Sequence, residues 1–529
     1  MQYELEPRKW RADFRKRHGH NPKVLFIGNV ANNAYQIAKL LNNAKIECDV
    51  LCNDYYHIMG SPEWEDADIK REGINQFYPK FSYNAGNKFK RPRWFAQGPL
   101  EDAIEYLSAR RKNKALGYFA WKKFEESRMD VIEHNGVISH VAKVKIYPDW
   151  LISVGYKCAE VFRSEKLKYR VDRITNAAWH KYRAAFMIKF SKDWQEAFPD
   201  RKELGWSDEC DMWLNAGYKL QPLMEYYDVV VGFGGSVLLP YFAGFENYVA
   251  FEHGTIRGFR ELSNDSQPLL MLAYAKSKVL YNTNTDCFDD AEYITKNTDS
   301  AHFCGLHGIG INELLSRLNN SNENRFRKEL NLSEDDFLIL CPARHDYDEK
   351  SGTYIKGDEK VAEAIGALAH GGHNFTVVMI NWGRDCIKYK AEIEKDDALK
   401  KHMIWIDPLG KADFEEAICS CDVILDQFNY SVFGAIAIEA MLGGKAVLVN
   451  HSIESGVMKN FFSSTWPILE ADTSKEIEES ITGVLLSKEK QKTIAERQFQ
   501  WVTKEHSADR IARLVCGSMA LALKDSVAR

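Results

Sequence analysis

Short apolar runs alternate with helix-like stretches at the beginning of the chain. Residues 23–28 (KVLFIG) are an apolar run that ends in glycine, residues 34–41 carry apolar side chains at helical spacing, and residues 46–52 (IECDVLC) are a second apolar run. Strands of a parallel sheet are buried on both faces, so they read as short uninterrupted apolar segments. The pattern predicts strand, loop, helix and strand, the beginning of a parallel sheet.

A different pattern follows over about residues 54–211, which are polar, aromatic and rich in Lys and Arg. Stretches such as residues 101–127 have helical spacing, and we expect a large, mostly helical insertion. The alternation then returns, with predicted strands at residues 226–236, 246–254 and 277–283.

A second alternating series begins after the glycine-rich residues 304–311, which we interpret as an interdomain linker. A charged helix is expected at residues 312–330. The later predicted strands are residues 336–344, 375–383, 402–407, 422–428 and 445–450, and the predicted helices are residues 357–370, 413–421, 433–442 and the charged stretch from about 488. These two series predict an α/β fold with two Rossmann-like domains that face a cleft, at residues 1–311 and 312–500, and a helical tail at 501–529.

The composition narrows the class of protein. The 529 residues are 45% hydrophobic and 27% charged, which is usual for a globular protein, and the net charge of −5 argues against a nucleic-acid partner. The eleven cysteines are scattered without a C-x-x-C pair, as in a cytosolic protein with reduced thiols. Neither an apolar run of the ~20 residues that cross a bilayer nor a secretory signal is recognised, so a cytoplasmic location is expected.

Three segments of the second half carry a family resemblance. Residues 421–450 (CDVILDQFNYSVFGAIAIEAMLGGKAVLVN) resemble the donor-binding strand–helix–strand of GT-B glycosyltransferases of the group 1 family (family 4). Residues 341–365 resemble the family's arginine followed by Lys-Gly, and residues 405–425 resemble its next acidic helix and strand. The resemblance covers residues 336–450 and extends weakly to residues 23–41 and 248–257.

This resemblance implies a GT-B fold and a glycosyltransferase that moves a sugar from a nucleotide-sugar donor to a glycan, lipid-linked or polysaccharide acceptor, with retention of configuration. The donor would bind the C-terminal domain, the acceptor would bind the N-terminal domain, and no metal or other cofactor is expected. Of the family's two glutamates, the second matches Glu439, whereas Ser431 stands in place of the first. Asp426 or Asn429 would then contact the donor sugar instead.

Two other functions stay open. A nucleotide-sugar 2-epimerase can have the same two-domain architecture and needs no separate acceptor, although the large insertion resembles acceptor machinery. A catalytically silent sugar-binding scaffold is favoured by the loss of the first glutamate and disfavoured by the presence of Glu439, Arg344 and Lys356.

Glu439 is the one charged residue among residues 433–442, an expected helix between two buried strands. A carboxylate in such surroundings is costly unless it accepts hydrogen bonds, and a ribose diol offers two donors. In the enzymes that this chain resembles, the matching glutamate binds the nucleotide ribose. The alternative is a glutamate that reaches solvent at the helix edge.

The loop at residues 429–434 follows a strand and begins a helix, where unpaired backbone N–H groups favour an anion. We therefore assign Ser431, Phe433 and Gly434 to the donor diphosphate, with Ser431 as a simple helix cap as the alternative.

Arg344 and Lys356 are the expected cations of the donor site. Negative charge grows on the diphosphate as it leaves, and fixed cations lower that barrier; GT-B enzymes resembling this chain use such a pair in place of a metal. The alternative is a set of salt bridges to neighbouring acids, among them Asp346 and Asp358. Asp346 and Asp348 also form a D-x-D pattern, which is too common to indicate a cation site.

The N-terminal half is expected to hold the acceptor. His253 would orient the acceptor or the donor sugar, Glu252 would serve as a base, and Arg257 is a weaker candidate for phosphate binding. A turn histidine with one backbone bond is the alternative for His253.

Two glycine turns are further acceptor-side candidates. Gly234 and Gly235 allow close backbone approach, or simply a tight turn. Gly28 ends the first strand, and Asn29 and Asn32 would hydrogen-bond sugar hydroxyls or cap the next helix.

Basic and aromatic residues are interleaved at residues 8–18, 88–94 and 109–124. Such stretches suit a peripheral contact with an anionic membrane at its inner face. The alternative is a solvated helical face whose charges are balanced by neighbouring acids.

Overall fold

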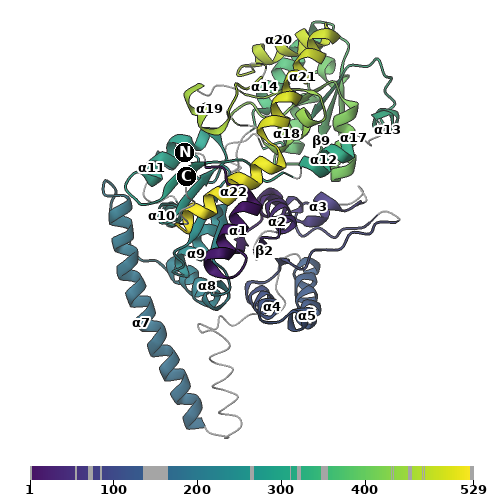
Figure 1. Ribbon diagram of the computed structural model, residues 1–529. Helices are drawn as coiled ribbons and strands as arrows, with labels where there is room; N and C mark the ends of the chain where they lie inside the picture. Colours follow the sequence, from purple (N-terminus) through teal and green to yellow (C-terminus); the bar gives the residue numbers. More distant parts are fainter. Residues whose placement is uncertain are drawn as a thin grey trace.

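In the computed structural model, the described residues are 3–53, 56–69, 75–83, 86–134, 165–261, 267–309, 311–318, 323–346, 356–430, 432, 434–450, 455–467, 469 and 471–524. Two parallel sheets organise this part of the chain, and each forms the centre of a lobe (Figure 1).

The sheet of the first lobe has seven strands in the order β3-β2-β1-β4-β5-β6-β7, all paired in parallel. This is the Rossmann order with one added edge strand, and it reverses direction between β1 and β4. The strands are β1 Lys23–Ile27, β2 Glu47–Cys52, β3 Phe95–Gln97, β4 Val229–Phe233, β5 Tyr248–Glu252, β6 Val279–Asn282 and β7 Ala301–Cys304.

The sheet of the second lobe has five strands in the order β10-β9-β8-β11-β12, again all parallel. Its direction reverses between β8 and β11, so each lobe has one switch point at which ligands of doubly wound folds bind. The strands are β8 Leu338–Cys341, β9 Thr376–Ile380, β10 Met403–Ile406, β11 Val423–Leu425 and β12 Ala446–Leu448. The predicted α/β fold of GT-B type, with two Rossmann-like units, is confirmed.

Helices cover both faces of each sheet because alternate strand residues point to opposite faces. In the first lobe, α4, α5, α7, α8, α9 and α10 pack on one face and α1, α2 and α22 on the other. In the second lobe, α14, α15, α16 and α20 cover one face and α17, α18 and α21 the other.

The first lobe and the link to the second contain α1 Pro7–His18, α2 Asn33–Asn43, α3 Pro62–Asp66, α4 Leu100–Lys112, α5 Lys114–Glu133, α7 Glu165–Ala197, α8 Asp208–Met224, α9 Leu238–Phe242, α10 Pro268–Ala275, α11 Phe288–Thr295, α12 Ile311–Leu318 and α13 Glu323–Glu329. The later helices are α14 Asp358–His370, α15 Cys386–Ile393, α16 Asp397–Lys400, α17 Lys411–Ser420, α18 Ala435–Leu442, α19 Ser455–Phe461, α20 Ser474–Leu485, α21 Lys488–Glu505 and α22 Ala508–Ala522. Short 3₁₀ turns are η1 Val30–Asn32, η2 Ile58–Gly60, η3 Gly234–Val237 and η4 Thr285–Cys287.

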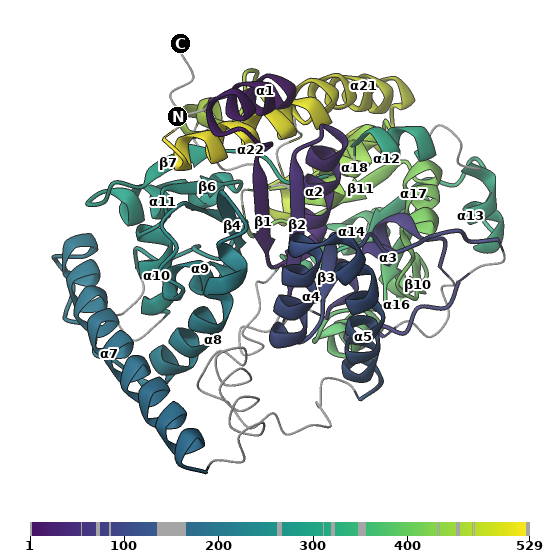
Figure 2. The ribbon, with the colours of Figure 1, turned by 60° about the horizontal axis from the view of Figure 1, so that its bottom comes forward.

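The C-terminal helix returns to the first lobe. Helix α21 packs on β12 and α18 of the second lobe, whereas α22 lies beside α1 and α2 on the first sheet (Figure 2). Arg510 and Arg513 of α22 each form an ion pair with Glu4, at 3.0 Å in both cases. The predicted domain boundaries stay predictions; within the predicted tail, α22 packs on the first lobe, and residues 525–529 lie outside the described residues.

Two short strands escaped the sequence analysis, and one predicted helix is divided. The predicted helical insertion at residues 54–211 contains β3, which extends the first sheet beyond β2, and β7 lies just before the predicted linker. Both lack the β-branched apolar residues that mark the similarly short β11 (Val-Ile-Leu) and β12 (Ala-Val-Leu). The predicted helix at residues 312–330 consists of α12 and α13.

Candidate functional site

Lys356 is hydrogen-bonded to described residues of the loop at 427–434 after β11, which is named the donor loop for the contact that the sequence predicted there. Lys356 Nζ donates to Gln427 Oε1 (2.8 Å), Phe428 N–H donates to the carbonyl of Lys356 (2.8 Å), and Gln427 Nε2 donates to the carbonyl of Val432 (2.6 Å). Gly357 makes this contact possible, since it has φ +87° and a Cβ there would lie 3.0 Å from Cβ of Phe428. The Lys-Gly pair thus brings an amine to the carboxyl end of β11.

Lys356 belongs to a cluster of charged side chains that shift the pKa of its amine. Burial lowers the pKa of its amine, the charges of Arg344 and Arg257 lower it further, and Asp426 opposes them. A lowered pKa means that the ammonium lacks full compensation for its charge, so an anion bound here would gain from it. Two of these cations, Arg344 and Lys356, belong to the second lobe, whereas Arg257 comes from the first.

Arg344 follows β8 at the switch point of the second sheet, as predicted. Its side chain is 39% exposed and lies 3.8 Å from Asp346, so the expected alternative, a salt bridge, is present only as a long contact. Arg344 also faces the first lobe: burial lowers the pKa of the His57 imidazole to about 4, and the positive charge of Arg344 contributes. Asp358, another alternative partner, instead accepts from His345 Nδ1 (2.9 Å).

Asp426 occupies the N-terminus of α18, where the sequence predicted a diphosphate. Gly434 N–H donates to Asp426 Oδ2 at 3.3 Å, and burial raises the pKa of this carboxyl while Lys356 lowers it. Ser431 and Phe433 lie outside the described residues. Since an anion of the chain itself faces the helix end, a bound phosphate would share Lys356 with Asp426.

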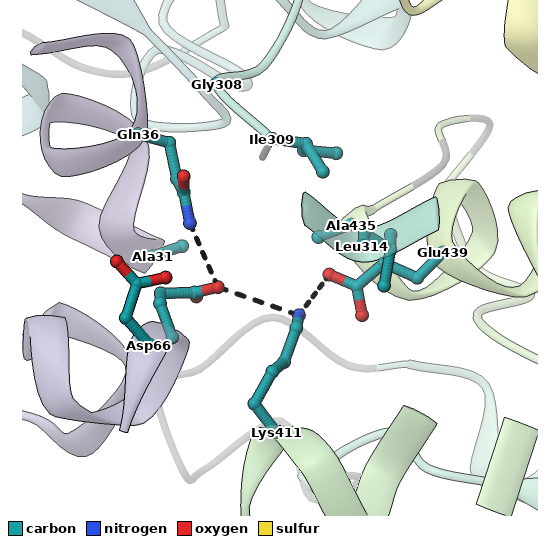
Figure 3. A pocket seen from close by; sticks show the side chains of 10 residues that line it. Ala31, Gln36, Asp66, Gly308, Ile309, Leu314, Lys411, Ala435 and Glu439 are labelled. Atoms are coloured by element: carbon teal, nitrogen blue, oxygen red, sulfur yellow. Dashed lines mark hydrogen bonds and ion pairs between the residues drawn. The ribbon is translucent and has the colours of Figure 1, made fainter. Parts of the chain in front are cut away.

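Glu439 is buried, which excludes the alternative of a side chain that reaches solvent. Its Oε1 forms a close ion pair with Lys411 of α17, and Lys411 Nζ also lies 3.8 Å from Glu65 Oε2 of α3 (Figure 3). Gln36 Nε2 donates to the same Glu65 oxygen at 3.1 Å. The carboxylate that the sequence assigned to ribose is therefore already compensated by a lysine, in a network that joins the two lobes.

This network lines a cavity of about 20 Å³ between α2, α3, α17 and α18. Such a volume holds about one water molecule. A ribose would need Lys411 and Glu65 to move away from Glu439, so its contact with Glu439 stays a prediction.

Glu252 is the last residue of β5 and His253 follows it, and both side chains have buried polar atoms. Glu252 Oε1 accepts from the N–H groups of Gly254 (2.6 Å) and Ile256 (3.0 Å), whereas its Oε2 has no hydrogen-bond partner within the described part of the chain. Burial raises the pKa of Glu252 to about 7, a value suited to proton transfer near neutral pH. Burial lowers the pKa of His253 to about 4, so its imidazole is neutral, and its Nε2 likewise has no hydrogen-bond partner among described residues.

We expect Glu252→Gln to remove a pH dependence of stability. The pKa of Glu252 is 4.5 ordinarily and about 7 when folded, so between these values the folded chain binds a proton that the unfolded chain lacks. Stability is therefore lost as the pH rises through 7. The melting temperature of the variant relative to the wild type should rise between pH 5 and pH 8; Glu261→Gln, at an exposed carboxylate, should show no such trend. A constant difference across this range would contradict the assigned pKa.

The turn after β1 in the first lobe is stabilised by hydrogen bonds between its own side chains and neighbouring groups. Asn29 Oδ1 accepts from Tyr35 N–H (2.9 Å) in the first turn of α2, so Asn29 makes the capping-type contact that was the alternative. Asn32 makes no such cap bond: its Oδ1 accepts from Asn29 Nδ2 (2.8 Å) and its Nδ2 donates to the carbonyl of Ser61 (3.0 Å). A Cβ on Gly28, at φ +86°, would lie 2.5 Å from Ser236 Oγ. Contact of these residues with an acceptor stays a prediction.

The second glycine turn packs against His253. A Cβ on Gly234 would lie 3.2 Å from His253 Cε1, whereas a Cβ on Gly235 would have no heavy atom within 4 Å. Gly234 thus serves close packing of the imidazole, and Gly235 faces open space.

The sequence analysis did not predict three of the contacts in and around the candidate site. Lys411 pairs with Glu439, Tyr430 lies across from Arg257, and the pair of His345 and Asp358 joins the two ends of the segment between Arg344 and Lys356. The sequence offered a weak signal for His345 alone, because it follows a predicted strand directly.

Some cations of the basic stretches at residues 88–94 and 109–124 are paired with acids within the first lobe. Arg91 donates to Glu63 at 2.7 Å, and Arg110 and Arg111 both contact Asp49, at 3.0 and 2.6 Å. These pairs favour the alternative of internally balanced charges, although Phe119 of α5 is 75% exposed. Within the described residues, no helix is both long and apolar enough to cross a membrane. Membrane contact stays a prediction.

In the part of the chain described, no group of three or more His, Cys, Asp or Glu side chains is arranged to hold a metal ion. The ten cysteines described are free and buried.

Comparison with known proteins gave similarity only at the level of structure. No protein-family model and no curated protein matches the chain. HepE from Anabaena, solved with UDP and glucose, is 15% identical over 58% of this chain and 81% of its own, with a TM-score of 0.45. Sucrose-phosphate synthase from Thermosynechococcus elongatus is 14% identical over 56% and 76%, with a TM-score of 0.42.

UDP-GlcNAc 2-epimerase from Neisseria meningitidis, bound to UDP-GlcNAc, is 12% identical over 95% of this chain and 100% of its own, with a TM-score of 0.45. Similarity this low carries no functional conclusion, and the fold assignment rests on the two sheets themselves.

Proposed function

We propose that this protein is a glycosyltransferase that takes a sugar from a nucleotide-sugar donor. The observation that supports the proposal is the convergence of Arg344, Lys356 and the donor loop at the switch point of the second sheet, with Arg257 approaching from the first lobe. A leaving diphosphate develops negative charge at this position, and fixed cations stabilise that charge.

In this proposal the diphosphate lies beside Arg344 and Lys356, and Glu439 accepts from the ribose once Lys411 has moved. The sugar points toward His253 and Glu252, where Glu252 receives the proton of the acceptor hydroxyl. The same proposal includes membership of the group 1 family, retention of configuration and a glycan or lipid-linked acceptor. It also includes a metal-independent reaction and a cytoplasmic or membrane-peripheral location.

Nucleotide binding tests the proposal most directly. Thermal unfolding of the full chain with UDP, GDP, ADP and CDP should reveal one diphosphate that raises the melting temperature, because a ligand that binds only the folded state stabilises it by mass action. If none of the four does so at millimolar concentration, the proposal is wrong.

The matching nucleotide-sugar then separates the enzymatic alternatives. A transferase releases the nucleoside diphosphate faster when an acceptor mixture is added. A 2-epimerase converts the nucleotide-sugar without an acceptor, and a silent scaffold binds it and leaves it unchanged.

A further inference from the structure

Arg257 of the first lobe lies against the donor loop of the second. Its guanidinium carbon is 4.4 Å from the ring centroid of Tyr430, a cation–π contact across the lobes. Arg257 Nε donates to Asp286 Oδ2 at 2.6 Å, which orients the guanidinium from its own lobe. The side chain is mostly buried, so its position is set by these neighbours.

The backbone beside Arg257 is shaped for a close approach. A Cβ on Gly254, which has φ +108°, would lie 3.1 Å from Arg257 Nη1 and 3.1 Å from Asn284 Nδ2. Only glycine tolerates this conformation together with this proximity. The turn after β5 therefore brings a guanidinium to the carboxyl edge of the first sheet.

Arg257 also acts electrostatically on the donor site. Its charge and that of Arg344 both disfavour the ammonium form of Lys356. Each cation has a carboxylate near it, Asp286 for Arg257, Asp346 for Arg344 and Asp426 for Lys356. Carboxylates from both lobes offset only part of the repulsion that Arg257 and Arg344 exert on Lys356, and a ligand with several negative charges would relieve the rest.

We propose that Arg257 is a third diphosphate-binding cation, supplied by the first lobe and oriented by Tyr430 and Asp286. This inference rests on the proposed function and specifies which phosphate of the donor Arg257 contacts. The sugar extends toward His253 in the first lobe, so the phosphate that carries the sugar lies nearest to Arg257. A guanidinium fork binds two phosphate oxygens at once, which joins the lobes around the donor.

The test compares a nucleoside diphosphate with its monophosphate by calorimetric titration of the full chain. The base is the one that stabilises the wild type, and the variants are Arg257→Gln, Arg257→Lys and the control Arg260→Gln. Arg260 belongs to the same turn, is about half exposed and pairs with Asp289, so its loss should not affect the ligand.

We expect Arg257→Gln to weaken the diphosphate about 10- to 100-fold and the monophosphate less than threefold. The diphosphate affinity of Arg257→Lys should lie between those of Arg257→Gln and the wild type. Arg260→Gln should bind both ligands with the affinities of the wild type. The ratio of the two affinities does not depend on the fraction of folded protein, so partial unfolding of a variant would not imitate the result.

If Arg257→Gln lowers both affinities equally, or neither, the assignment of Arg257 to the outer phosphate is wrong while the proposed function stands. If the wild type binds no diphosphate, the proposed function itself fails.

Discussion

Lys356→Met should lower kcat for donor turnover by about 100- to 1,000-fold, the usual effect of removing one preorganised group that stabilises transition-state charge. Its Nζ is held by Gln427 beside the donor loop, so no rearrangement is needed to meet the charge of the leaving diphosphate. Arg344→Met should have a similar effect, because Arg344 follows β8 at the same edge of the second sheet. Steady-state release of the nucleoside diphosphate measures kcat for both variants.

Lys475→Met is the matched control for this measurement. Lys475 belongs to the same lobe, its side chain is 81% exposed, and its ion pair with Glu479 spans 3.6 Å. Its loss should leave kcat within a factor of two. A Lys356→Met variant that retained more than a third of the wild-type kcat would exclude Lys356 from charge stabilisation in the reaction.

Lys411→Met should lower the free energy of unfolding by about 3–5 kcal/mol, because it breaks the buried ion pair of Lys411 with Glu439 by removing one partner. Glu65, 3.8 Å from the same ammonium, would lose this ion pair and keep the hydrogen bond from Gln36. The double variant Lys411→Met/Glu439→Gln should recover a large part of this loss, since it removes both buried charges of the pair. Equilibrium unfolding in guanidinium chloride, with the slope checked for a single transition, measures the three free energies.

Lys395→Met serves as the control for burial. Lys395 pairs with Glu392 at 2.7 Å, but its side chain is 68% exposed. Such surface pairs contribute about 0–1 kcal/mol, so this change should be small. Equal losses for Lys395→Met and Lys411→Met would contradict the buried network between the lobes.

The apolar runs of the chain predicted most of the strands because parallel strands covered on both faces leave an uninterrupted signal. Residues 23–28, 375–383 and 445–450 contain β1, β9 and β12 as expected. Strand β3 was missed because its three residues, Phe-Ala-Gln, lie in a basic and aromatic stretch, and only pairing with β2 makes them a strand.

Residues of the candidate site could be predicted when their position after a strand places them in the site. Arg344, Lys356 and Asp426 lie at the carboxyl edge of the second sheet because each follows or faces a strand end of a doubly wound fold. Glu439 was singled out as a carboxylate in an apolar helix, and that inference about burial is confirmed. Its pairing with Lys411 was not accessible, because a sequence shows that a buried charge needs a partner but not which one.

By itself, the sequence determined the alternation of strands and helices, the two Rossmann-like units and the set of chemical groups that follow the strands. Tertiary structure decided which charges meet: Lys411 with Glu439, Arg257 with Tyr430, and the amides of Asn29 and Asn32 with each other. The physical reason is the distance over which each effect acts. Periodicity reflects burial of neighbouring residues, whereas ion pairing and pKa shifts depend on distances of a few ångströms that arise only when the two lobes are packed together.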